Sequence, residues 1–255
     1  MNEMMDKIWQ WNQPQLFSLF VTVIIIIIIS LVAYYKVSKV KPHEAPKGIA
    51  FVAEAYVSGI DNNLNDVFEG KLSKSKPYLF VLATFLVIGN MLVVFGLEPI
   101  ASSYSIPFIL AISSWLGIFV IGGIYQKIRY LKKYLNPLEI PGAFSPLISL
   151  SLRLYGNIVG GGVIMFLIYT IFGYAWTSIS PNHQWYFFSV IFTPIFHIYF
   201  DLFDTLLQCY IFTLLTSIYW LSEVSEGEEE KGSETKGVKN FLSKLKLKRK
   251  TNAIY

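Results

Sequence analysis

Charged residues and cysteine are both scarce in this sequence of 255 residues. Charged side chains make up 15% of the chain, whereas an average globular chain carries roughly a quarter. A soluble domain of this length would need more charge on its surface. The single cysteine, Cys209, excludes an internal disulfide. Hydrophobic residues account for 54% of the sequence and aromatic residues for 16%, so the composition disfavours an ordinary soluble fold.

The sequence also lacks the common motifs of nucleotide-binding and hydrolytic sites. No G-x4-G-K-[S/T] phosphate loop occurs, because GKLSKS at 70–75 has no glycine at the required upstream spacing. The patterns G-x-S-x-G, H-E-x-x-H and C-x-x-C are absent as well. We therefore expect a chain that is not an enzyme on its own, that binds no nucleotide or nucleic acid, and that holds no cofactor.

Long apolar runs are what the sequence has instead. The run at 16–35 supplies about twenty apolar or small residues, enough to cross a ~30 Å hydrocarbon core as a helix. It is longer than the ~7–15 residues of a signal-peptide core, and acidic Glu3 and Asp6 precede it, so we expect a retained span. The apolar runs together predict an all-α polytopic membrane protein with five membrane segments, at about 16–35, 78–95, 106–125, 147–176 and 185–221.

The distribution of lysine and arginine predicts the orientation. All but two of the 21 cations lie in the connections 36–76 and 127–133 or in the tail after Leu221, and the connections 96–105 and 178–184 have none. Since cations collect on the cytoplasmic side, we expect an outer N-terminus and a cytoplasmic C-terminus. No transit peptide is visible, so we expect a bacterial plasma membrane.

These segments suggest five regions. They are an outer N-terminal segment with the first membrane helix (1–35), a cytoplasmic loop (36–77), the second and third membrane helices (78–126), a long helix pair (127–222) and a charged cytoplasmic tail (223–255).

The cytoplasmic loop and the final spans carry further information. Apolar residues recur at helical spacing over 48–68, which predicts an amphipathic helix on the membrane surface, docked either on a partner or on the protein's own spans. A last span of roughly 37 residues would be about 55 Å long, against ~30 Å of hydrocarbon. The last two spans must therefore break or tilt steeply, and only packing against a large partner would hold such a tilt. The start of the tail at 223 is highly charged and low in apolar residues, so we expect it to be disordered. The basic end of the tail is either solvated or near anionic headgroups.

Arg153 is the one cation inside a predicted membrane span. Such a residue costs on the order of 2.5–3.5 kcal/mol on insertion scales, and its default interpretation is a functional site with a carboxylate partner. Its i±4 neighbours, Ser149 and Asn157, are polar but neutral. Gly156 and Gly160 have the small-xxx-small spacing that permits close helix approach. The alternative is a structural ion pair with an acid on the last span of the same chain.

The last span contains the acids. A polar stripe follows the spacing i, i+4, i+7, i+8 and i+11 of an α-helix, formed by His197, Asp201, Asp204, Thr205 and Gln208. A His-x3-Asp pair is a weak metal motif, because a convincing site needs three or four ligands and no other His or Cys lies nearby. Titratable groups along a membrane helix favour a hydrated proton or ion path. Glu139 adds an acid near the inner end of the preceding span.

Two motifs resemble a known family. SLSLRLYGN at 149–157 and LLQCYIFTLLTSIYW at 206–220 are similar to subunit a of the bacterial F-type ATP synthase, as are KPHEAPKG at 41–48 and GLEP at 96–99. The resemblance covers most of the chain. It implies that the partners are the ring of c subunits, the peripheral stalk b subunits, the remaining ATP synthase subunits and the lipid bilayer.

The resemblance also implies residue roles. Arg153 would face each ring carboxylate in turn, force its deprotonation and block a proton leak between two aqueous half-channels. The outer half-channel would be lined by Asn157, Asp201, Asp204 and Gln208. Glu139 would flank the inner half-channel.

The sequence departs from the family pattern at two positions. Relatives commonly carry a titratable residue nine positions after the arginine, where this chain has Gly162, and Glu or His where it has Asp201. His197 and Asp204 are the candidates to relay the proton in place of the missing group. The rival functions are a secondary transporter with an intramembrane Arg–Asp site, although no internal repeat is visible, and a purely structural assembly subunit.

Overall fold

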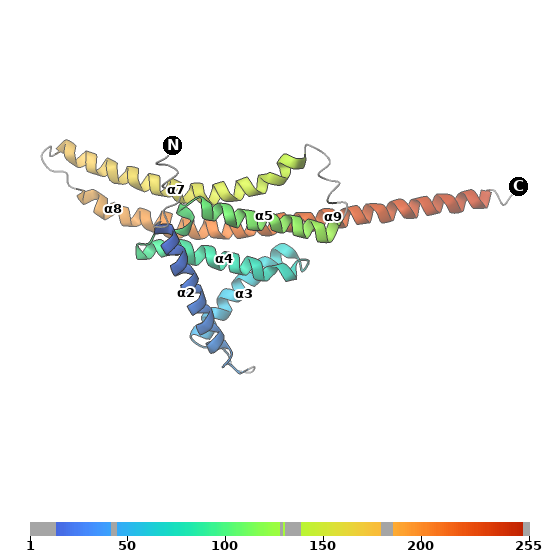
Figure 1. Cartoon of the computed structure of the whole chain (residues 1–255), viewed down its shortest axis with the longest axis horizontal. Coiled ribbons are helices and arrows are strands. Elements are labelled where there is room, and N and C mark those ends of the chain that lie inside the picture. Colours follow the sequence, from blue (N-terminus) through green and yellow to red (C-terminus); the bar gives the residue numbers. More distant parts are fainter. Residues whose placement is uncertain (1–13, 42–44, 128–129, 131–138, 180–185, 252–255) are drawn as a thin grey trace.

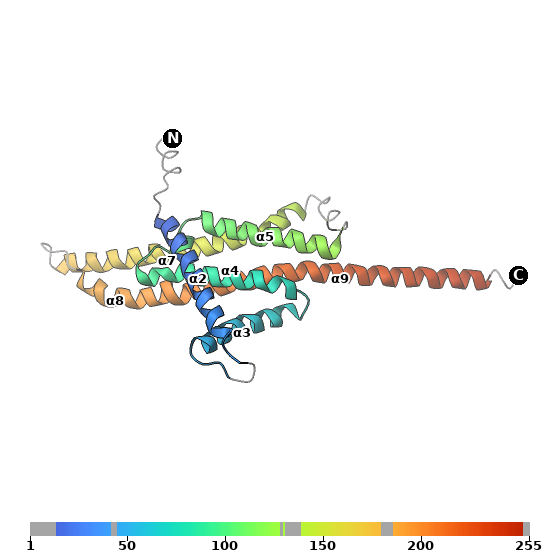
Figure 2. The same ribbon diagram turned by 60° about the horizontal axis from the view of Figure 1, so that its bottom comes forward.

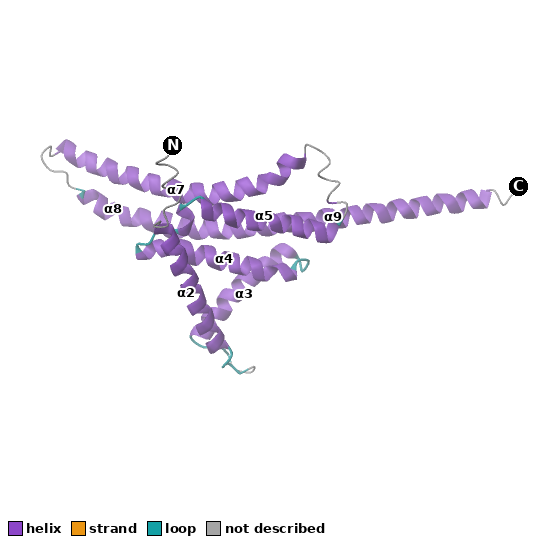
Figure 3. Cartoon of the chain, viewed as in Figure 1, coloured by secondary structure: helices purple, strands orange, loops and turns teal. Residues whose placement is uncertain are grey.

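The computed structural model describes residues 14–41, 45–127, 130, 139–179 and 186–251, and over these residues the chain is helical with no strand (Figure 3). Long α-helices make up most of it (Figure 1). They are α2 (Pro14–Val37), α3 (Ile49–Phe68), α4 (Lys76–Met91), α5 (Ser105–Gln126), α7 (Glu139–Ile179), α8 (Phe187–His197) and α9 (Thr205–Thr251). Four short elements connect or extend them: η1 (Ser73–Ser75), η2 (Leu92–Phe95), η3 (Ile100–Ser102) and η4 (Ile198–Asp204).

The predicted all-α polytopic membrane fold is confirmed. Five helical stretches in the described residues are long and apolar enough to cross a membrane: Pro14–Val37, Ser73–Phe95, Ser105–Gln126, Pro141–Ser178 and Ser189–Glu228. The outer N-terminal segment expected before Pro14 lies outside the described residues. So does most of the connection between α5 and α7.

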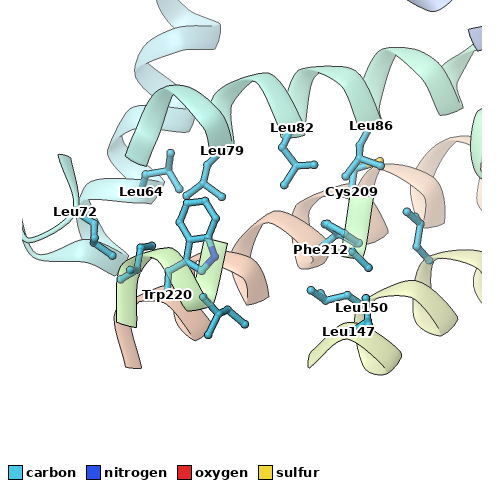
Figure 4. Packing of buried hydrophobic residues seen from close by; sticks show 14 of the residues in the cluster. Leu64, Leu72, Leu79, Leu82, Leu86, Leu147, Leu150, Cys209, Phe212 and Trp220 are labelled. Atoms are coloured by element: carbon cyan, nitrogen blue, oxygen red, sulfur yellow. The ribbon is translucent and has the colours of Figure 1, made fainter. Parts of the chain in front are cut away.

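The core lies where α4, α5, α7 and α9 pack together (Figure 4). Leucines of α4 and α7 meet large apolar side chains of α9, among them Leu86, Leu150 and Phe212, all of which are buried. Trp220 of α9 covers Gly117 of α5, where a side chain would collide with the indole ring. The absence of a side chain at Gly117 therefore sets how closely α5 and α9 approach.

The first span stands apart from this core. In Figures 1 and 2, α2 crosses the helices of the core at a steep angle, meets α4 with its N-terminal half and lies beside α3 with its C-terminal end. Only Ser18 and Thr22 of α2 are buried, while most of its long isoleucine run is exposed. Because those isoleucines gain nothing from water, this surface belongs in lipid or against another membrane protein.

The amphipathic helix predicted over 48–68 is present as α3. Its C-terminal half packs on the protein's own spans, with Leu64 and Phe68 buried in the core cluster. Lys76 Nζ, at the start of α4, lies 2.8 Å from Asp61 Oδ1 and fixes the two helices together. The N-terminal half of α3 leaves Phe51 exposed, so α3 both docks on its own chain and presents a free apolar end.

The two final spans are as long as expected, but the second is not one α-helix. α7 has 41 residues, or about 62 Å of helix. Between α8 and α9, residues Ile198–Asp204 form a π-helix. Pro194 lies one turn earlier and has no backbone N–H to donate, which disturbs the hydrogen-bond ladder there. The predicted α-helical stripe from His197 to Gln208 was therefore wrong in its geometry, since a π-turn shifts the face on which later residues lie.

The tail differs from the expectation that its start is disordered. α9 continues without interruption from Thr205 to Thr251 and passes the expected region boundary at residue 223 (Figure 2). Glutamate and lysine are good helix formers, and a helix already formed in the membrane removes the nucleation step that an isolated segment faces. Lys71 Nζ, 2.7 Å from Glu228 Oε2, ties this helix to the loop before α4.

Candidate functional site

The site is built around the position of Arg153 on α7. Arg153 lies 14 residues after the start of α7 at Glu139 and 26 before its end at Ile179, or about 21 Å and 39 Å along the helix. Leu150 and Leu154 on the same helix are buried in the core, whereas Arg153 is exposed on another face. The helix therefore holds the guanidinium away from the protein's own core.

Arg153 has little to bind within its own chain. Its Nη2 donates a hydrogen bond to Ser149 Oγ at 3.3 Å. Among the residues that the structure describes, no carboxylate lies within 4.0 Å of it. Within the described residues, therefore, the structural alternative of an ion pair between Arg153 and an acid on the last span is not formed.

The glycines near Arg153 leave space beside it. A Cβ placed on Gly156 or Gly160 would meet nothing within 4 Å, so no described part of the chain approaches α7 closely there. The close contact falls instead at Gly161, where a Cβ would lie 3.5 Å from Phe200 Cδ1. The small-xxx-small pair is thus open to the outside of the molecule, and Gly161 is the glycine on which η4 packs.

The hairpin of α7 and α8 fixes which residues share a level. Tyr169 and Tyr186 stack with ring centroids 4.6 Å apart, and Ser189 Oγ donates to the carbonyl of Tyr169 at 3.3 Å. The two helices run antiparallel, as Figure 1 shows for the pair at the yellow and orange part of the colour scale. Counting from the Gly161–Phe200 contact back along α7 and forward into α9 brings Arg153 level with Gln208.

Gln208 lies at this level and is buried, with 6% of its surface exposed. Its Nε2 has no hydrogen-bond partner among the described residues. Buried amides almost always have a partner, so this one is left for water or for a group that the chain does not supply. Asn157, one turn beyond Arg153, is half-buried.

Two of the predicted residues contact each other directly. His197 Nδ1 is within hydrogen-bond distance of Asp201 Oδ2 across the junction of α8 and η4. The two side chains are 52% and 29% exposed, respectively. Asp204 is half-buried, and no ion pair joins it to Arg153 within the described residues. A His–Asp contact can share one proton and pass it on.

A cavity of about 290 Å³, lined by both polar and apolar side chains, opens at the N-terminal end of α7. Residues of α5, α7 and α9 line it, among them Glu139 and Glu223. Gln126 Nε2 donates to Glu223 Oε2 at 2.9 Å, which orients that carboxylate. A cavity of ~10–15 Å³ can hold one water molecule, so this cavity has room for several.

Glu223 was not among the residues that the sequence analysis selected. It begins a charged stretch and was assigned to the tail. The signal that would have found it is its position three residues after Trp220, which places it on the face of α9 that packs on α5. In the part of the chain that the structure describes, no group of three or more His, Cys, Asp or Glu side chains could hold a metal ion.

These features define the class as an all-α polytopic membrane protein with a cation and several acids within its candidate membrane spans. Comparison with known proteins then gives the family, since the model of the family described as ATP synthase A chain matches residues 16–221. The chain belongs to the ATP synthase subunit a family.

The similarity to individual relatives extends over nearly the whole chain. The chain is 30% identical over 245 residues to an ATP synthase subunit a of Mycoplasmoides gallisepticum, covering 85% of this chain and 81% of that one. It is 30% identical over 247 residues to an ATP synthase subunit a of Mycoplasma pneumoniae, covering 89% and 84%. For an ATP synthase subunit a of Mycoplasma genitalium the values are 28% over 257 residues, 91% and 88%.

Proposed function

We propose that this chain is the proton-translocating stator of an ATP synthase membrane sector, with two half-channels and Arg153 facing the carboxylates of a rotating c-ring. The observation that carries the proposal is the state of Arg153. It lies deep in a membrane helix, is exposed, and among the described residues its side chain forms a hydrogen bond only with Ser149. A cation at that depth needs an anionic partner, and an external ring carboxylate would be one.

Arg153 would couple proton movement through the stator to rotation of the c-ring. A ring carboxylate that reaches Arg153 is stabilised in its charged form, because an opposite charge within ~4–6 Å lowers the pKa of an acid. The carboxylate then releases its proton before it passes. A fixed positive charge also repels a proton moving directly between the half-channels. A membrane potential of 100 mV supplies about 2.3 kcal/mol per charge, and a direct leak would dissipate it.

The outer half-channel is assigned to the polar residues near η4. His197 and Asp201 form an acid–base pair on a single helix, which compensates for Gly162 on the facing helix. Gln208 and Asn157 continue the path toward the level of Arg153. Nε2 of Gln208, which has no hydrogen-bond partner among the described residues, would donate to a water molecule there. Asp204 lies between Asp201 and Gln208 in sequence and adds a second carboxylate to the path.

The inner half-channel is assigned to the cavity at Glu139. Glu139 stands at the first turn of α7 and Glu223 on α9, and both line a space large enough for water. The proton would leave the ring carboxylate on this side and reach the cytoplasm between α5, α7 and α9.

The remaining assignments follow from the same function. The exposed apolar faces of α7, α8 and α9 would meet the c-ring, and the exposed surfaces of α2 and α3 would meet lipid and the peripheral stalk b subunits. The chain would lie in a bacterial plasma membrane. Its N-terminus would be outside and its C-terminus in the cytoplasm, as the lysine and arginine bias predicts.

Arg153→Ala in the whole complex tests this function. We expect assembly to survive while proton-coupled ATP synthesis and ATP-driven pumping are abolished. Arg153→Lys should fail too, because a compact ammonium does not reproduce a planar and permanently charged guanidinium. Lys36→Ala, a charge removal at the end of α2, is the matched control and should pump normally.

Two results would contradict the proposal. Normal pumping by assembled Arg153→Ala complexes would leave a structural subunit as the function. Ion flux through vesicles that contain this chain alone, with no ring protein, would instead indicate a secondary transporter.

A further inference from the structure

The last part of α9 leaves the helical bundle at a defined point. Gly227 packs against the end of α5, where a Cβ would lie 3.1 Å from Gln126 Cγ. One residue later, Glu228 forms its ion pair with Lys71 at 2.7 Å. Beyond Glu228 the helix runs on to Thr251, about 34 Å further, and Figure 1 shows this red segment extending past every other helix.

The sequence of this projecting helix has two distinct halves. Its first half is rich in glutamate, up to Glu234, whereas the stretch 236–250 has seven lysines and arginines and no acid. The apolar positions of the stretch fall at i, i+3, i+4 and i+7, and they are Val238, Phe241, Leu242 and Leu245. On a helical backbone these positions share one face, and Leu247 is the one apolar residue of the stretch outside it.

We propose that residues 236–250 form a basic amphipathic helix that binds the anionic headgroups of the membrane in which the chain is embedded. A helix with an apolar stripe and a lysine-rich remainder is typical of segments that lie in the plane of a membrane interface. The partner is a lipid surface and not a nucleic acid, because phosphate-backbone binding uses the cations and has no use for an apolar stripe.

The tether makes this contact favourable. α9 is anchored in the bundle up to Glu228, so the basic segment is always close to the same bilayer, and binding is intramolecular. The glutamates of the first half keep that half away from an anionic surface. Gly232 and Gly237 are positions where a helix bends easily, which lets the basic half turn onto the membrane.

The experiment uses the full chain reconstituted in nanodiscs, with Cys209→Ser removing the native thiol. An environment-sensitive fluorophore is attached at Leu245→Cys on the apolar stripe, and in a matched control at Ser243→Cys on the opposite side. Quenching by a nitroxide on the lipid chain near the headgroup is measured in phosphatidylglycerol and in phosphatidylcholine nanodiscs.

We expect strong quenching of the label at 245 in phosphatidylglycerol, weak quenching at 243, and loss of both signals in phosphatidylcholine. Combining Lys244→Gln, Lys246→Gln and Lys248→Gln should lower the bound-to-free ratio of the segment roughly a hundredfold. High salt should act in the same direction, since it screens surface charge.

The opposite results overturn the proposal. Equal quenching at 245 in both lipids, or none in either, would show that anionic headgroups do not hold the segment. Protection of the label only by added RNA, or only after assembly with other subunits, would assign the helix to a different partner. No readout depends on proton pumping. The lipid-binding proposal can therefore fail while the stator function stands, and the stator function can fail while the lipid-binding proposal stands.

Discussion

The close contact between Gly117 and Trp220 predicts that adding a single methyl group at residue 117 lowers the stability of the fold. A Cβ at Gly117 would lie 2.3 Å from Trp220 Cζ2, far inside the ~3.5–4.0 Å of ordinary carbon contacts. The indole cannot simply move aside, because it is 4% exposed and its Nε1 donates to the carbonyl of Ser114 at 2.9 Å. Gly117→Ala must therefore push α5 and α9 apart or force Trp220 from its rotamer.

The size of this destabilisation can be isolated with a matched pair of variants on α5. Overpacking a core by one methyl group costs about 1–3 kcal/mol, while alanine in place of a helical glycine contributes about 0.5–1 kcal/mol of stabilisation. Gly123→Ala in the same helix receives only the second effect, since no atom lies within 4 Å of its Cβ. The two variants should thus differ by about 1–3 kcal/mol, or roughly 2–12 °C in melting temperature.

Thermal unfolding of the purified chain in mild detergent measures this difference. Gly123→Ala should melt at or above the wild-type temperature and Gly117→Ala below Gly123→Ala. Trp220→Leu combined with Gly117→Ala should cost less than the sum of the two changes, because neighbouring sites are not additive. Equal melting temperatures for the two glycine variants would refute the packing of α5 on α9 described above.

Three further predictions concern single side chains. Asp201→Asn should slow ATP-driven proton pumping at least severalfold by removing the carboxylate that contacts His197, and an unchanged rate would place the outer path elsewhere. Cys209, at 1% exposure, should resist maleimide in the native chain and react only after denaturation, so rapid native labelling would contradict its place in the core. The hydrogen bond from Lys76 lowers the pKa of Asp61, so the ion pair should stabilise the chain above the ordinary pKa of 3.8 and lose its effect as pH falls through the lower native pKa. Asp61→Asn should abolish that acid dependence of the melting temperature, and an identical acid profile in the variant would show that the pair is not formed.

Much of the fold could be predicted because its signals are local. The isoleucine run of α2 is sufficient by length alone to predict a span. The spacing of Ile60, Leu64 and Val67 similarly predicts the face of α3 that packs on the core. The sequence did not predict that the helix continues past residue 223. Composition indicates only whether a segment would fold by itself, whereas α9 is already helical where the tail begins, so no new helix has to be nucleated.

The site was harder to predict because it depends on how helices meet. The sequence singles out Arg153 because a cation inside a membrane is energetically costly. It does not predict the antiparallel register of the helices, which brings Arg153 level with Gln208. The π-turn that contains Asp201 has no reliable sequence pattern, so an α-helical stripe was the natural expectation. Glu223 was hidden for a related reason, since only the packing of α9 on α5 turns a tail glutamate into part of a cavity.

The π-turn at Ile198–Asp204 makes the orientation of α8 depend on the number of residues in one short segment. Each residue of an α-helix turns the chain by about 100°. Removing one residue there would let the backbone return to regular α-helical bonding at little local cost, yet it would rotate all of α8 about its axis. His197 would then point in a new direction relative to Gln208, and the tyrosine and phenylalanine stacks on α7 would lose their partners. A change of chain length by a single residue is therefore more damaging at this point than many substitutions, and insertions or deletions in this segment should be the rarest kind of variation that a working chain accepts.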